Sequence, residues 1–165
     1  MILKNWWFIK EDMAVGRRQP ERYSPISLPE QEEGEMTALS VLIVDDKIEF
    51  AAALLERLLA RGLKAEAVHS GKEALSSVIT NPPDVVILDL KLPDLNPLEV
   101  LEAIKTFDPA IEIIILTDHE TATMAIEGME HGAFDYFIKP IDFDLLLEKI
   151  YLSSGQNKEI RSRLM

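Results

Sequence analysis

The sequence predicts an α/β fold in which a parallel β-sheet lies between two layers of helices. Two observations support this prediction: five short apolar segments alternate with five segments of helical periodicity, and three of the apolar segments are continuous runs rich in β-branched residues. Such runs are typical of strands buried on both faces of a parallel sheet. The alternation of strand and helix favours the doubly wound arrangement, with helices on both faces.

The chain that must build this fold has 165 residues, a formal net charge of −12 and no cysteine. This length suits one ordinary domain with a short extension, and the lack of cysteine excludes disulfide scaffolds, thiolate metal sites and cysteine nucleophiles. The negative charge disfavours binding to nucleic acid or to an anionic membrane. No apolar run approaches the roughly 20 residues of a membrane-spanning helix. We therefore expect a cytoplasmic protein that binds neither nucleic acid nor membrane.

The first 36 residues differ in composition from the remainder. Prolines recur at Pro20, Pro25 and Pro29, and residues 30–35 form a polar run of like charge, which predicts a flexible N-terminal extension over residues 1–36. The apolar patch at residues 6–9 would dock on a partner or on the domain itself if translation begins at Met1. Translation that begins near Met36 would leave this patch out. We expect the folded domain to span residues 37–154.

The five expected strands are the apolar segments 41–44, 65–68, 85–88, 113–116 and 134–138. The second and fifth segments mix apolar and polar residues, so we place these two strands at the edges of the sheet.

Start and stop signals separate the strands from the helices. Ser70 and Glu73 form a capping box, in which the Ser side chain accepts from a free backbone N–H and the Glu side chain reaches back. Asn96 precedes Pro97, which suits the first position of a helix because its missing N–H is not needed there. Two glycines are placed to end helices, Gly62 and Gly132.

The fourth expected helix carries apolar residues at i, i+3, i+4 and i+7, which predicts one buried stripe. The members of the stripe are Ala122, Ala125, Ile126 and Met129. The fifth helix is expected to end near residues 153–155.

Chemically active side chains stand at the carboxyl ends of four of the expected strands: Asp45 and Asp46, then Asp89, Thr117 and Lys139. In a doubly wound sheet, ligands bind outside this edge, where the strand order reverses. We therefore expect three carboxylates, a hydroxyl and an ammonium group to converge on one site.

Three carboxylates at close range would repel one another by several kcal/mol at an effective dielectric of ~20, so one must be protonated or a cation must lie among them. Oxygen ligands without histidine or cysteine favour Mg²⁺ or Mn²⁺. Such a site suits a phosphoryl group: Asp89 would be the nucleophile, the metal and Lys139 would offset negative charge, and the Thr117 hydroxyl would bond one phosphoryl oxygen.

Four motifs, at residues 42–46, 86–93, 115–117 and 136–140, together resemble the receiver domains of bacterial response regulators, in particular the nitrogen-regulator-like branch. The resemblance covers residues 39–152 and fills the five signature positions in order. It implies a flavodoxin-like sheet of five strands in the order 2-1-3-4-5 with five helices. It also identifies residues 37–154 as a receiver domain in a two-component phosphorelay.

The resemblance implies that a sensor histidine kinase donates a phosphoryl group to Asp89. The receiver would then either relay the phosphoryl group to a histidine phosphotransfer protein or present a changed surface to a partner. Mg²⁺ would bind Asp46, Asp89 and the carbonyl of Lys91 directly, and Asp45 mostly through water. The protein would catalyse only its own aspartyl phosphorylation and dephosphorylation.

The resemblance also implies a conformational switch, in which Tyr136 turns inward when Thr117 moves toward the phosphoryl group. The bond between Lys139 and Pro140 is expected to be cis. The face built by the fourth helix, fifth strand and fifth helix would then bind a downstream effector protein or form a phosphorylation-dependent homodimer. Since residues 155–165 are too few for an output domain, we expect a stand-alone receiver with a short C-terminal tail.

One position departs from the pattern of the family. Asp118 stands where receivers usually carry Ala or Gly, and its carboxylate would crowd or repel an incoming phosphoryl group. The alternative function is therefore a degenerate receiver that is not phosphorylated and acts as a protein-binding module.

Overall fold

The structure is a computed structural model that describes residues 38–164, with side chains as far as Gly155. The chain divides into two units, Met1–Thr37 and Ala38–Met165. The N-terminal extension predicted over residues 1–36, and its apolar patch at 6–9, lie outside the described residues.

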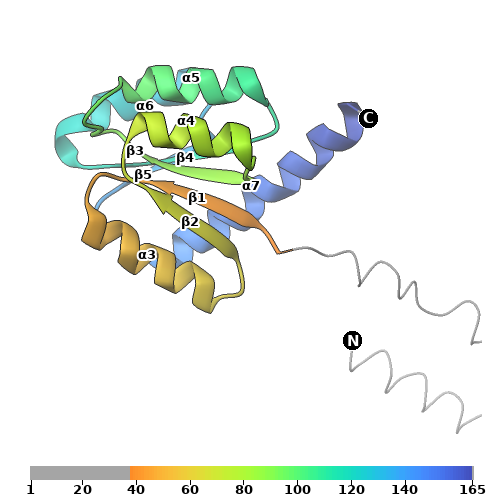
Figure 1. Ribbon diagram of the computed structural model, residues 1–165, viewed down its shortest axis with the longest axis horizontal. Coiled ribbons are helices and arrows are strands. Elements are labelled where there is room, and N and C mark those ends of the chain that lie inside the picture. The colour runs from red at the N-terminus through yellow and green to blue at the C-terminus, as the bar shows by residue number, and fades with distance from the viewer. Residues whose placement is uncertain (1–37, 165) are drawn as a thin grey trace, which may run out of the picture. The chain divides into compact units, whose positions relative to one another are not determined.

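Five parallel strands form one sheet in the order β2-β1-β3-β4-β5 (Figure 1). Their bounds are β1 Ser40–Val44, β2 Lys64–Val68, β3 Val85–Asp89, β4 Glu112–Thr117 and β5 Asp135–Ile138. The predicted doubly wound fold and strand order are confirmed, and the two mixed segments form the edge strands β2 and β5.

The strands are connected by five α-helices and one short 3₁₀ helix. Their bounds are α3 Ile48–Ala60, α4 Gly71–Thr80, α5 Pro97–Phe107, η2 His119–Thr121, α6 Ala122–Glu130 and α7 Phe143–Leu164. Figure 1 shows α3 and α7 on one face of the sheet and α4, α5 and α6 on the other. No helix in the described part of the chain is long and apolar enough to cross a membrane.

Successive side chains of a strand point to opposite faces of the sheet, so the strands contribute to two separate hydrophobic cores. In β1, Leu42 and Val44 pack toward α4, α5 and α6, whereas Val41 and Ile43 pack toward α3 and α7. Strands β3 and β4 are buried at every position. This explains why they appear in the sequence as continuous apolar runs.

The helix starts follow the predicted side-chain caps. The Ser70 hydroxyl accepts from the backbone N–H of Glu73 at 3.2 Å, and the Glu73 carboxylate accepts from the N–H of His69, one residue before the position expected of a capping box. Asn96 accepts from the N–H of Leu98 at 2.9 Å. Two helices end at glycines with positive φ, Gly62 at +86° and Gly132 at +107°.

The stripe predicted for α6 is wrong. Ala125 is buried as expected, but Ile126 is 54% exposed and Met129 is 36% exposed, while Gly128 is buried instead. A Cβ atom at Gly128 would collide with the Ile115 side chain of β4. The small residues Ala125 and Gly128 allow α6 to lie close to the sheet, and this approach turns the larger side chains outward.

The predicted end of the last helix is also wrong. Helix α7 does not stop near residues 153–155 but continues to Leu164, so the segment predicted as a C-terminal tail is helical as far as Leu164. The Ser153 and Ser154 hydroxyls donate to the carbonyls of Ile150 and Tyr151 within the helix. These serines therefore satisfy their hydrogen bonds inside the helix and do not end it.

Candidate functional site

Three aspartates meet at the carboxyl edge of the sheet. Asp45 and Asp46 follow β1 and Asp89 is the last residue of the neighbouring strand β3. One carboxylate oxygen from each lies within 4.8 Å of the others. Asp45 and Asp89 are buried, and Asp46 is exposed. The cluster therefore has a buried floor and one side open to solvent.

Lys139 brings a positive charge to the buried part of this cluster. Its ammonium lies 2.9 Å from a carboxylate oxygen of Asp45 and 3.8 Å from one of Asp89. The same ammonium lies 4.3 Å from the centroid of the Phe50 ring, which the α3 helix supplies. The peptide bond between Lys139 and Pro140 is cis, as the resemblance implied.

The carboxyl group of Asp89 is hard to ionise in this setting. Burial and the negative charge of Asp45 raise its pKa to about 6, although Lys139 and the backbone N–H of Lys91 favour the ionised form. Its Oδ2 atom is buried and has no hydrogen-bond partner among the described residues. A buried carboxylate oxygen of this kind is costly unless another group binds it.

The residues present fit a divalent metal ion. A cation among the three carboxylates would offset their mutual repulsion and would supply a partner for Asp89 Oδ2. Hard carboxylate ligands without sulfur or imidazole favour Mg²⁺ or Mn²⁺. The ligands available in this cluster are Asp45, Asp46 and Asp89, and the chain of Lys91 lies two residues beyond the last of these.

Thr117 ends β4 beside this cluster and is fully buried. Its hydroxyl donates to the backbone carbonyl of Asp118 at 3.2 Å and also contacts the hydroxyl of Thr121. Tyr136, on β5, is half-buried and packs against the core beneath α4, α5 and α6. The predicted switch residues therefore lie on adjacent strands, and the Thr117 hydroxyl is bonded within its own loop.

The Asp118 carboxylate, which was expected to crowd or repel an incoming phosphoryl group, forms an ion pair with Lys91. One of its oxygens lies 2.6 Å from the ammonium of Lys91, which is also 2.9 Å from a carboxylate oxygen of Glu120. The hydrogen bond from Lys91 is the main reason that the pKa of Asp118 falls to about 2. The sequence predicted a role only for the backbone carbonyl of Lys91, and the contact made by its side chain was not predicted.

Phe50 was missed as well. An aromatic residue in an amphipathic helix gives no signal that it will lie under a lysine from the other end of the domain. The Lys91–Asp118 pair did leave a signal, since opposite charges follow two strands that are expected to be neighbours.

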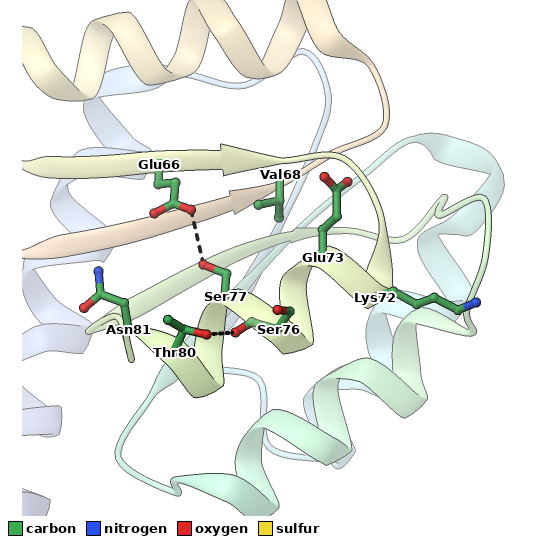
Figure 2. Close-up of a pocket in the computed structure, with 8 residues that line it drawn as sticks. All are labelled: Glu66, Val68, Lys72, Glu73, Ser76, Ser77, Thr80 and Asn81. Atoms are coloured by element: carbon green, nitrogen blue, oxygen red, sulfur yellow. Dashed lines mark hydrogen bonds between the residues drawn. The ribbon is translucent and has the colours of Figure 1, made fainter.

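Hollows on the surface do not by themselves locate the site. One of about 530 Å³ lies between β2 and α4 (Figure 2) and contains none of the clustered aspartates. Its lining residues are Glu66, Val68, Lys72, Glu73, Ser76, Ser77, Thr80 and Asn81. A second hollow of about 440 Å³ lies at the start of α3 and includes Asp46 and Phe50. The second hollow adjoins the open side of the aspartate cluster.

Comparison with known proteins agrees with this geometry. The model of the family described as response regulator receiver domain matches residues 41–151. A solved response regulator receiver domain protein from Clostridium thermocellum is 31% identical with a TM-score of 0.70, over 74% of this chain and 98% of that one.

Curated relatives include the transcriptional regulatory protein ZraR of Klebsiella oxytoca, 35% identical over 66% of this chain and 24% of that protein. The regulatory protein LuxO of Vibrio vulnificus is 36% identical over 63% of this chain and 23% of that protein. The chain thus spans about a quarter of the length of these curated relatives.

Proposed function

The chain belongs to the response regulator receiver domain family, and from this premise we propose that it accepts a phosphoryl group on Asp89 and changes its surface in response. The setting of Asp89 carries the proposal. This carboxylate ends a central strand, one of its oxygens is buried without a hydrogen-bond partner among the described residues, and carboxylates and an ammonium surround it. These are the groups that phosphoryl transfer to a carboxylate requires.

In the proposed reaction Asp89 is the nucleophile. One of its carboxylate oxygens forms a bond to phosphorus while the bond from phosphorus to the donor's leaving group breaks, and the leaving group departs with the electron pair. A pKa of about 6 leaves most of the Asp89 carboxyl ionised at neutral pH. The donor would be a phosphohistidine of a sensor kinase or of a phosphotransfer protein.

The proposed cofactor is Mg²⁺, held by Asp46, Asp89 and the carbonyl of Lys91, with Asp45 beside them. When bound, Mg²⁺ would offset negative charge on the transferring oxygens. Lys139 already lies 3.8 Å from Asp89 and would contribute a second positive charge there. These positive groups favour the transfer because they stabilise charge that water would otherwise solvate.

Thr117 and Tyr136 are proposed to carry the signal away from Asp89. The Thr117 hydroxyl would leave its bonds within the loop and donate to a phosphoryl oxygen, and Tyr136 would then move inward. The face formed by α6, β5 and α7 exposes Ile126, Met129 and Ile138, which supports a protein partner there. That partner is a downstream effector or a second copy of the phosphorylated chain.

Three other expectations remain predictions. They are that the protein binds neither nucleic acid nor membrane, that it is cytoplasmic, and that it is a stand-alone receiver. The curated relatives are about four times as long as the matched segment. The activities of a whole protein of that length are therefore not assigned to this chain.

The alternative, a degenerate receiver, rested on repulsion by Asp118. Because Lys91 lies 2.6 Å from that carboxylate, its charge is largely balanced, and the pairing favours a receiver that can be phosphorylated. A protein-binding module would nevertheless keep the same fold. The two functions differ in whether Asp89 gains a phosphoryl group.

Incubation with acetyl phosphate and Mg²⁺, followed by intact-protein mass spectrometry, tests the proposal. We expect the wild-type protein to gain the mass of one phosphoryl group and the Asp89→Asn variant to gain none. Asp144→Asn, which changes an exposed aspartate of α7, is the matched control and should label like the wild type. A wild-type protein that stays unlabelled with acetyl phosphate and with every histidine kinase of its host would support the binding module instead.

A further inference from the structure

Three charged side chains outside the aspartate cluster form a separate group, which we call the clasp. Its members are Lys91, from the loop after β3, and Asp118 and Glu120, which follow β4. The side chains of Lys91 and Asp118 are 39% and 29% exposed, whereas that of Glu120 is 81% exposed. The inner ion pair is therefore the one between Lys91 and Asp118.

The clasp connects the two loops that carry the proposed reacting groups. Lys91 follows Asp89 by two residues, in the loop that begins where β3 ends. Asp118 directly follows Thr117, the last residue of the neighbouring strand β4. The ends of β3 and β4 are side by side, because Asp89 is paired with Leu116 in the register of these two strands. The ion pair thus lies between two neighbouring strand ends, at the edge where the aspartates gather.

Asp118 is held in place by more than its ion pair. One carboxylate oxygen accepts from the backbone N–H groups of Glu120 and Thr121, at 3.0 and 3.2 Å, and from the Thr121 hydroxyl at 3.1 Å. Its backbone carbonyl accepts from the Thr117 hydroxyl at 3.2 Å. Lys91 therefore binds a residue that is itself connected to Thr117.

We propose that Lys91 is a positioning residue for phosphoryl transfer to Asp89, acting by holding and neutralising Asp118 beside the acidic site. This inference rests on the proposed function. Lys91 acts through Asp118 and not by contact with the phosphoryl group. Its presence explains how a receiver can carry an acidic residue at this position.

Lys91 is expected to favour phosphoryl transfer because the phosphoryl donor is negatively charged. A phosphoryl donor is an anion, and it must approach a site that already contains three carboxylates. Without Lys91, the Asp118 carboxylate would still be ionised at neutral pH and would add to the repulsion. Without Asp118, the ammonium of Lys91 would be left with Glu120 alone and would attract the donor more strongly.

Rates of phosphorylation by acetyl phosphate at low salt test this inference. In this reaction a carboxylate oxygen of Asp89 bonds to phosphorus as the bond from phosphorus to acetate breaks, and acetate leaves with the electron pair. We expect Lys91→Met to react about 10-fold more slowly and Asp118→Asn about 3-fold faster, as expected for one unit charge near the site. The double variant has the net charge of the wild type and should react at nearly the wild-type rate.

Two further measurements separate charge from a merely structural role. The differences between variants should shrink at about 1 M salt, because salt screens exposed charges. They should also be smaller with phosphoramidate, which carries less negative charge than acetyl phosphate at neutral pH. Lys91→Arg should keep the wild-type rate, and Lys72→Met, which removes one positive charge from α4 outside the clasp, is the matched control.

The possible results are distinct. If Lys91→Met and Asp118→Asn both slow the reaction, or if the double variant is slower than either single variant, the clasp supports the fold and the inference is wrong. Equal rates for the wild type and all the variants overturn the inference alone. A wild-type protein that cannot be labelled overturns the proposed function, and the inference with it.

Discussion

Two aspartates at neighbouring strand ends have opposite electrostatic character. Asp89 ends β3 and Asp118 directly follows β4. Yet the pKa of Asp89 is raised to about 6, and the pKa of Asp118 is lowered to about 2. Two aspartates at the same edge of the sheet, one strand apart, therefore differ in how readily their carboxyl groups ionise.

The two shifts have different causes: burial and the negative charge of Asp45 raise the pKa of Asp89, whereas hydrogen bonds, first of all from Lys91, lower the pKa of Asp118. Asp89 is buried beside Asp45, and its closest ammonium, that of Lys139, is 3.8 Å away and bonds to Asp45 at 2.9 Å. Asp118 accepts directly from Lys91 and from the N-terminus of η2. A carboxylate oxygen that has no hydrogen-bond partner can bind a metal or attack phosphorus. A carboxylate that already accepts several hydrogen bonds serves instead to order its loop.

The largest effect on stability is expected from substitution of Lys139, whose ammonium lies beside the buried carboxylates of Asp45 and Asp89. Lys139→Met should lower the free energy of unfolding by about 2–4 kcal/mol at pH 8 without divalent metal, because it leaves buried carboxylates without their cation. Urea unfolding measures this change. The loss should be smaller at pH 5, where protonation relieves part of the repulsion. Lys91→Met, in the exposed clasp, is the matched comparison and should have a much smaller effect; equal losses would contradict the contrast between the two regions.

The raised pKa of Asp89 predicts that the Asp89→Asn substitution stabilises the folded protein, by an amount that depends on pH. Because the folded-state pKa of about 6 exceeds the ordinary value of 3.8 for an aspartate, ionisation of Asp89 favours the unfolded state, and this destabilisation develops as pH rises from about 4 to about 6. Without divalent metal, Asp89→Asn should therefore be more stable than the wild type by about 1–2 kcal/mol at pH 8. The gain should nearly vanish at pH 4. Thermal unfolding at a series of pH values measures it, and a gain independent of pH would show that burial of the charge is not its cause.

The smallest effect is expected at Asp118, where the cap and the charge can be separated. Asp118→Asn keeps an oxygen for the N–H groups of Glu120 and Thr121 and should shift the melting temperature very little. Asp118→Ala removes the cap and should lower the melting temperature further. Equal shifts for both variants would mean that the ion pair with Lys91, and not the cap, orders this loop.

The pH dependence of the Asp118 contribution should run in the opposite direction to that of Asp89. A pKa lowered to about 2 means that the folded state favours the carboxylate. The contribution is present above the unfolded-state pKa of about 4 and is lost as pH falls toward 2. The two aspartates therefore respond to acid with opposite signs.

The sequence alone determined the fold and the position of the acidic site. Continuous apolar runs identified the central strands, and parallel strands place their carboxyl ends at one edge, so the chemical groups at residues 45, 46 and 89 had to converge. These predictions depend on sequence patterns only a few residues long. Such local patterns do not depend on which distant side chains pack together.

Only the tertiary structure decided which side chains pair at that edge and how α6 turns. The pairing of Lys139 with Asp45 and that of Lys91 with Asp118 join segments 94 and 27 residues apart in the chain. The orientation of α6 was set by Gly128 against Ile115. Hydrophobic periodicity says which positions favour burial, but close packing selects one arrangement among several similar ones. Because hydrogen bonds and charges depend on distances of a few ångströms, their partners follow from that choice.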